Sequence, residues 1–163
     1  MKKQSLPILI LIAAFLCLNC QTENPQETSA NYQGLMYGFV LNGNLDDHTT
    51  GAAIDLREGM NNDTLYVFDF LNNQSQGTQK IILSEEDVVY FAKTINSTIV
   101  DRVKNVPSNS TGVKDGTKVN LYERSANFHV NVDIQIINDI KTELPSLDSL
   151  IKRIQAKGAR LNY

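Results

Sequence analysis

The chain has 163 residues, a formal net charge of −3 and 42% hydrophobic residues, with no tryptophan. This length fits one domain with a core of moderate size. No run of basic residues is longer than a pair such as Lys152 and Arg153. Because nucleic-acid affinity comes mostly from neutralising phosphates, the composition argues against a nucleic-acid partner.

The first 20 residues have the pattern of an export signal. Lys2 and Lys3 precede an apolar run over residues 6–18. That run fits the roughly 7–15 residues of a signal-peptide core and is shorter than the ~18 residues that span a bilayer. After Cys20 the sequence turns polar, with no aliphatic residue except Ala30 before Leu35. This abrupt change predicts a segment that is cut from the folded protein.

The only two cysteines, Cys17 and Cys20, stand where the apolar run ends. This arrangement resembles the signal of a bacterial lipoprotein, in which a signal peptidase cuts just before a cysteine that then carries the lipid. The resemblance implies a signal peptide over residues 1–19 and fatty-acyl chains such as palmitate on Cys20. The usual leucine and small residue before that cysteine are replaced here by Cys17 and Asn19. An ordinary secretory signal is therefore the alternative.

Residues 20–33 are predicted to form the lipid-anchored tether, and residues 34–163 the single globular domain. The tether is polar, contains Pro25 and has no hydrophobic periodicity, which is typical of a flexible spacer. With Cys17 removed and Cys20 acylated, the domain keeps no thiol. Neither an intramolecular disulfide nor a cysteine-based metal site is then possible.

The first half of the domain reads as a meander of short strands joined by turns that contain glycine or asparagine. We expect strands at residues 34–41, 52–58, 64–71 and 78–83. In the third of these, alternation places Tyr66, Phe68 and Phe70 on one face and Leu65 and Val67 on the other. Since both faces are apolar, this pattern predicts a central strand covered on both sides.

A helix is predicted to begin after Ser84. This serine stands three residues before Asp87, a spacing that approximates a capping box, and acidic residues in the first turn suit the helix dipole. Apolar residues then recur at helical spacing at Val88, Phe91, Ala92, Ile95, Ile99 and Val103. The helix should end near Lys104 because Pro107 follows.

Two more strands and a second helix complete the chain. Residues 116–124 should pair with residues 126–136. In the second of these strands one face is expected to be buried and the other wet, with the apolar positions at Phe128, Val130, Val132, Ile134 and Ile136. Pro145 opens the last helix, and Gly158 should end it. The apolar side of that helix carries Leu147, Leu150, Ile151 and Ile154.

The element order predicts an α+β domain: an antiparallel, twisted sheet of about six strands in the order ββββαββα, with two helices packed on one face. A strand that runs straight into a helix over residues 80–95, after a meander, resembles the arrangement in PUR-like and Whirly-like single-strand nucleic-acid-binding folds. The sequence lacks the basic and aromatic surface that such binders need. The resemblance therefore bears on the fold and not on the function.

Two polar groups are candidate binding residues. Asp46, Asp47 and His48 offer metal ligands in one loop, but that loop lacks the glycine and glutamate of a calcium-binding EF-hand. A solvated hairpin loop is therefore favoured, and no metal is expected. The polar face of the last strand forms a possible binding face, made of His129, Asn131, Asp133 and Gln135. Within one strand, His129 and Asp133 lie about 13 Å apart at ~3.3 Å per residue, which excludes a catalytic pair.

No sequence motif of a serine hydrolase, a metalloprotease, a phosphate-binding loop or a dinucleotide fold occurs. We therefore predict no catalytic residue and no cofactor. The favoured function is that of a lipid-anchored protein of the bacterial cell envelope, at the outer membrane, with a non-catalytic binding or accessory role. Its partners would be the membrane, through the lipid on Cys20, and a protein or another envelope component. The alternatives are an envelope hydrolase whose site joins distant residues and, with less support, a PUR-like or Whirly-like binder of single strands.

Overall fold

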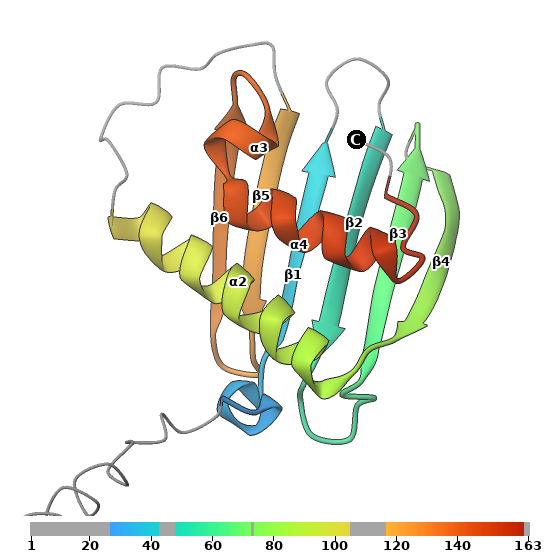
Figure 1. The fold of residues 1–163 in the computed structure, drawn as a ribbon, viewed down its shortest axis with the longest axis vertical. Coiled ribbons are helices and arrows are strands. Elements are labelled where there is room, and N and C mark those ends of the chain that lie inside the picture. The colour runs from blue at the N-terminus through green and yellow to red at the C-terminus, as the bar shows by residue number, and fades with distance from the viewer. Residues whose placement is uncertain (1–26, 43–47, 73, 105–116, 162–163) are drawn as a thin grey trace, which may run out of the picture.

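The computed structural model describes residues 27–42, 48–72, 74–104 and 117–161, and shows one six-stranded sheet with helices against it (Figure 1). The strands are β1 (Met36–Asn42), β2 (His48–Asp55), β3 (Thr64–Leu71), β4 (Gln74–Ile82), β5 (Thr117–Arg124) and β6 (His129–Ile136). The helices are the 3₁₀-helix η1 (Ser29–Tyr32) and the α-helices α2 (Glu85–Lys104), α3 (Ile140–Glu143) and α4 (Pro145–Ala156). The predicted α+β class and antiparallel sheet are confirmed. None of the described helices is long and apolar enough to cross a membrane.

Neighbouring strands are antiparallel throughout, in the spatial order β4-β3-β2-β1-β5-β6. The chain lays down β1 to β4 as a meander, returns across the sheet through α2, and adds β5 on the free side of β1. Figure 1 shows α2 and α4 side by side on one face of the sheet. We call this the covered face. The opposite side of the sheet, over which no described helix lies, is the open face.

Aliphatic and aromatic side chains fill the space between the covered face and the two helices. Phe39 on β1 and Phe91 on α2 are fully buried, and their rings stack with centroids 6.1 Å apart. The predicted apolar side of α4 is confirmed, since all four of its residues are buried. Removal of apolar surface from water is the dominant favourable term in folding, so this layer holds the domain together.

The first turn of α2 is tied to the end of α4 through Asp87. Ser84 caps α2 as predicted: its Oγ lies 2.6 Å from Asp87 Oδ2 and 3.3 Å from the Asp87 backbone nitrogen. Arg153 Nε donates to Asp87 Oδ1 at 2.7 Å, and Lys157 Nζ lies 2.8 Å from Oδ2. Burial alone would raise the pKa of Asp87, but the hydrogen bonds from Lys157, Ser84 and Arg153 outweigh it and hold that pKa far below its usual range.

Several boundaries differ from the sequence prediction. β2 begins at His48 because residues 49–51 pair with both β1 and β3, although their Thr-Thr-Gly sequence reads as a loop. β4 begins at Gln74, where a register shift beside Asp69 lets a polar segment join the sheet. The four-residue α3 was not predicted. Its cap is Asp139, whose side chain accepts a hydrogen bond from the Thr142 backbone at 2.6 Å.

Three packing predictions were wrong. β3 is second from the edge and not central, so the side that carries Tyr66 lies on the open face without a helix over it. Val103 continues the apolar stripe of α2 but is 59% exposed, because this end of the helix runs past β6 (Figure 1). Phe128 precedes β6 and is 52% exposed, because it belongs to the turn before the strand.

Residues 27–33, which the sequence analysis assigned to the tether, pack against the domain. Ser29 donates from its backbone N–H and from its hydroxyl to Glu85 Oε1, at 2.8 and 2.7 Å. Lys93 Nζ lies 2.7 Å from Glu27 Oε2. Only residues 21–26 then separate Cys20 from this docked segment, and they reach about 20 Å at ~3.3–3.6 Å per residue.

Candidate functional site

Aromatic side chains of β3 line one side of the open face. Tyr66, Phe68 and Phe70 follow one another at alternate positions, and all three are half-buried. The rings of Phe68 and Phe70 lie 6.2 Å apart, edge to face. Lys80 Nζ, on β4, lies 5.6 Å from the centre of the Tyr66 ring, a cation–π contact. The result is an apolar patch that solvent reaches, in place of the second covered face that the sequence predicted.

Two glycines let aromatic rings lie against the central strands. Gly51 on β2 stands in register with Phe68, and Gly38 on β1 stands in register with Tyr122 of β5. A Cβ atom on Gly51 would collide with the Phe68 ring, and one on Gly38 would collide with the Tyr122 ring. Close approach of this kind is one of the roles that only glycine fills. The glycines therefore form a floor on which rings from β3 and β5 lie.

A tyrosine on β5 and an ion pair at the end of β2 add polar groups to the open face. Burial raises the pKa of Tyr122 to about 12, and the charge of Asp55 adds to this effect, so the Tyr122 hydroxyl stays protonated at neutral pH. Arg57 binds the Asp55 carboxylate through two hydrogen bonds, at 2.8 and 2.5 Å. These bonds lower the pKa of Asp55 despite its burial. At neutral pH the open face therefore carries a protonated tyrosine hydroxyl and an ionised Asp55 carboxylate.

The predicted binding residues of β6 lie on the same open face, at the opposite side of the sheet from the aromatic patch of β3. His129, Asn131, Asp133 and Gln135 stand in register with the open-face residues of β5. Asn120 Nδ2, on β5, donates to Asn131 Oδ1 and, at 2.5 Å, to Asp133 Oδ1. This network holds the side chains in one arrangement. The structure therefore places the predicted polar group on the same face as the aromatic residues of β3, with β2, β1 and β5 between them.

Of the second predicted group, Asp46, Asp47 and His48, only His48 lies within the described residues. His48 opens β2, and its Nε2 lies 2.8 Å from Asp69 Oδ1 on β3. Asp46 and Asp47 lie outside the described residues. Within the described part of the chain, no three His, Cys, Asp or Glu side chains come together as a metal site would require. The hydroxyl of Thr50, two residues along β2, donates to the Phe68 carbonyl at 3.3 Å.

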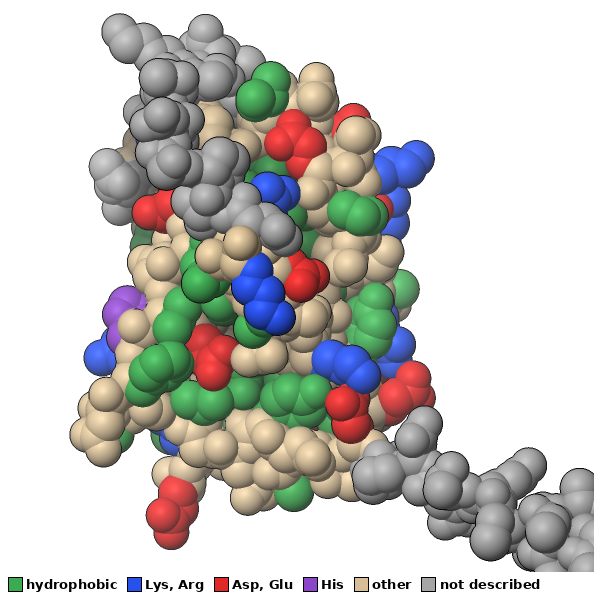
Figure 2. All heavy atoms as spheres, turned by 90° about the vertical axis from the view of Figure 1, so that its left-hand side faces the viewer, with side chains coloured by type: hydrophobic (Ala, Val, Ile, Leu, Met, Phe, Trp, Pro, Cys, Tyr) green, Lys and Arg blue, Asp and Glu red, His purple; other side chains and the backbone are tan. Residues whose placement is uncertain are grey.

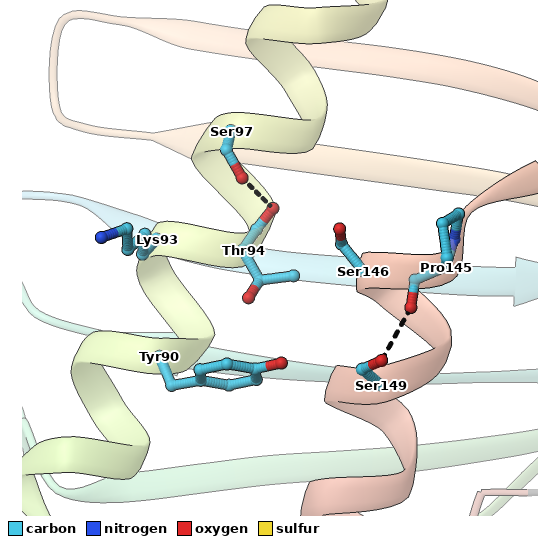
Figure 3. A pocket seen from close by; sticks show the side chains of 7 residues that line it. All are labelled: Tyr90, Lys93, Thr94, Ser97, Pro145, Ser146 and Ser149. Atoms are coloured by element: carbon cyan, nitrogen blue, oxygen red, sulfur yellow. Dashed lines mark hydrogen bonds between the residues drawn. The ribbon is translucent and has the colours of Figure 1, made fainter.

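A hollow of about 360 Å³ lies between α2 and α4 (Figure 3). Its lining is rich in hydroxyl groups, from Tyr90, Thr94, Ser97, Ser146 and Ser149. Ser97 and Ser149 donate to carbonyls of their own helices, at 3.2 and 2.9 Å. Lys93 points away from the hollow in Figure 3 and pairs with Glu27. Because Ser97, Ser149 and Lys93 are engaged locally, we assign no ligand to this hollow.

The aromatic half of the open face was missed at the sequence level. The available signal was three aromatic residues at alternate positions together with glycines in nearby strands. Its meaning depends on which strands are neighbours, and only the sheet order gives that. Searches against protein-family models and against curated proteins found no match to this chain. The functional argument therefore rests on the open face and on the pattern of the first 20 residues.

Proposed function

We propose that this chain is a lipid-anchored protein of the bacterial cell envelope whose role is to bind another envelope protein through its open face. The observation that carries this proposal is the row of half-buried aromatic rings, Tyr66, Phe68 and Phe70, beside the glycine floor. Protein interfaces combine an apolar centre rich in aromatic residues with a polar rim. The open face has this arrangement, with the polar residues of β6 on one side and Lys80 on the other.

The sequence pattern before Cys20 supports attachment to a membrane. The docked segment limits how far the domain can lie from that membrane. The six residues between the lipid and the docked segment hold the domain within about 20 Å of the membrane. This short reach favours a partner that is embedded in that membrane or lies close to it. An envelope protein meets this condition, whereas a partner free in solution would gain nothing from the anchor.

Site-specific photo-crosslinking in intact cells tests the binding face. A photo-reactive phenylalanine analogue replaces Phe70 on the open face, and in a matched control it replaces Tyr90, a half-exposed aromatic residue of α2 on the other side. We expect a discrete crosslinked protein from position 70 alone, lost when Tyr66→Ser and Phe68→Ser are added. The same products from both positions, or none from position 70, would contradict the proposal.

Metabolic labelling with a clickable fatty acid tests the anchor separately. The label should appear on the wild-type protein and on Cys17→Ala, and it should vanish from Cys20→Ala, which should also leave the membrane fraction. A label that survives in Cys20→Ala, or that never appears, would remove the lipid anchor from the proposal while leaving the crosslinking result to stand by itself.

A hydrolase is the second candidate because His48 contacts Asp69, a pairing that hydrolases use to orient a general base. A fluorophosphonate probe, which labels activated serines, checks this alternative. Labelling of the wild type that is lost in His48→Ala would favour the hydrolase. Absence of labelling in both is the expected outcome.

A further inference from the structure

The two edges of the sheet differ in how they are protected. Edge strands invite pairing with another chain unless bulges, charges or covering segments prevent it. β4 has a register shift opposite Asp69, a glycine with φ of +123° at Gly77, and a side chain, Gln79, that hydrogen-bonds the chain near Gly158 at 2.8 Å. β6 pairs with β5 without any shift and contains no proline, lysine or glycine. Among the described residues, the regular edge without such protection is therefore β6.

The backbone groups that β6 directs outward can be identified from its hairpin. Ser125 N donates to the Phe128 carbonyl at 2.8 Å, so these two residues form a hydrogen-bonded pair. Such pairs alternate along an antiparallel ladder. The backbone groups of even-numbered residues in β6 therefore point to β5, whereas those of His129, Asn131, Asp133 and Gln135 point to the free edge. Four N–H donors and four carbonyl acceptors lie there at the spacing that an added strand requires.

Apolar side chains surround this edge. Val130 and Val132 are half-buried beneath α2, and exposed hydrophobic residues lie near both ends of the strand, with Phe128 52% and Ile137 63% exposed. Figure 2, which views the molecule from the β6 side, shows hydrophobic side chains gathered there. The last turn of α2 runs past β6 in Figure 1 and carries Val103 on the line of its buried stripe. Apolar side chains would therefore cover one side of a seventh strand added at this edge.

We propose that the occupant of this edge is β6 of a second copy of the chain, paired antiparallel about a two-fold axis at Asn131. In this register His129 stands opposite Asp133 of the second copy, twice, and Val130 stands opposite Val132. Directly opposite residues have Cβ atoms about 4.5–5.5 Å apart, so the dimer joins two groups that cannot meet within one chain. An axis at Asp133 would instead place two carboxylates opposite each other. Charge therefore favours the axis at Asn131 over the axis at Asp133.

A proline at position 131 tests the pairing with little risk to the fold. Because the Asn131 N–H points outward, Asn131→Pro removes an edge donor and adds a ring on the free side, where edge strands tolerate proline. Asn131→Ala is the matched control, since it removes the same amide side chain but keeps the N–H. Both are compared with the chain from residue 20 onward carrying Cys20→Ser, by sedimentation equilibrium. We expect dimers for the parent and Asn131→Ala, and monomers for Asn131→Pro with an unchanged circular dichroism spectrum.

Charge reversal tests the register. His129→Asp places two carboxylates opposite each other at each end of the interface, and should weaken dimerisation by roughly 2- to 30-fold for the two pairs together. The double variant His129→Asp with Asp133→His restores opposite partners and should recover most of the loss. A double variant as weak as the single one would overturn the register.

Three results would overturn the dimer itself. The first is a parent protein that stays monomeric at the highest soluble concentration. The second is a dimer that persists in Asn131→Pro. The third is amide hydrogen exchange at His129, Asn131 and Asp133 that is slow but independent of concentration, which would mean that another segment of the same chain, such as residues 105–116, covers the edge. The proposal predicts protection that rises with protein concentration.

Discussion

The covered and open faces of the sheet are built from the same strands but use different side chains. On β5, Val119 and Leu121 are buried beneath the helices, whereas Asn120 and Tyr122 alternate with them on the open face. The covered face is apolar, and the helices close it off from solvent. On the open face, large aromatic rings pack against glycines and remain half-exposed. Because side chains alternate along a strand, one strand can contribute to the core with one face and present residues to a partner with the other.

The two faces should respond differently to mutation, since they differ in how much contact each side chain loses. A buried ring is surrounded by protein on all sides, and its removal leaves a cavity. A half-exposed ring loses contacts on one side only, and water fills the space. The predictions below rest on this difference and run from the largest expected effect to the smallest.

Phe91→Ala should cause the largest loss of stability. The Phe91 ring is fully buried and stacks on Phe39. Truncation of a buried phenylalanine costs about 3–5 kcal/mol in the free energy of unfolding. Equilibrium unfolding in urea measures the loss. A change below about 1 kcal/mol would mean that the core between the sheet and α2 is not packed as described.

Gly51→Ala should cost about 1–3 kcal/mol, as overpacking usually does. The new Cβ would meet both the Phe68 ring and the backbone carbonyl of Phe39, so the ring must move and the strands must shift. Urea unfolding measures the cost, and near-ultraviolet circular dichroism reports the displaced ring. The double variant with Phe68→Ala should recover only part of the stability, because the carbonyl is still in the way. Full recovery would show that the backbone contact is unimportant.

Asp87→Asn should cost about 1–2 kcal/mol, because it weakens the hydrogen bonds from Arg153 and Lys157. In the folded protein the pKa of Asp87 lies below the value of about 3.9 in an unfolded chain. Its contribution is therefore complete above about pH 4 and is lost as the pH falls towards the folded-state pKa. Urea midpoints measured from pH 6 to pH 2 should converge for the wild type and the variant. Parallel curves would contradict the role of the ionised carboxylate.

Local sequence patterns were enough to predict most of the fold. The alternation from Val130 to Ile136 in β6, the cap at Ser84 and the stop at Gly158 depend on neighbouring residues only, and the structure has them where the sequence placed them. The start of β2 was missed because threonine and glycine are ambiguous without knowledge of the flanking strands. Val103 was expected to be buried because periodicity gives the direction of a side chain but not the width of the sheet beneath it.

The candidate site was only half predictable for a related reason. Alternation showed that both faces of β3 are apolar, but it did not show which face the helices cover or that β2 and β1 offer glycines beside the rings. The polar residues of β6 were identified because a single strand contains them all. A site that spans β3, β2, β1 and β5 needs the sheet order, which no local signal in the sequence carries.

Phe70→Ala should have the smallest effect on stability, below about 1 kcal/mol, because its half-exposed ring packs mainly against the edge of Phe68. The change is chemically identical to Phe91→Ala, so the difference between the two unfolding free energies measures the difference between the faces directly. Crosslinking to an envelope partner from a neighbouring open-face position, such as 66, should nevertheless fall in Phe70→Ala and not in Phe91→Ala that remains folded. If Phe70→Ala were as destabilising as Phe91→Ala, the open face would be part of a buried layer, covered by residues outside the described part of the chain. Its rings would then serve stability, and the partner surface would have to be sought elsewhere on the domain.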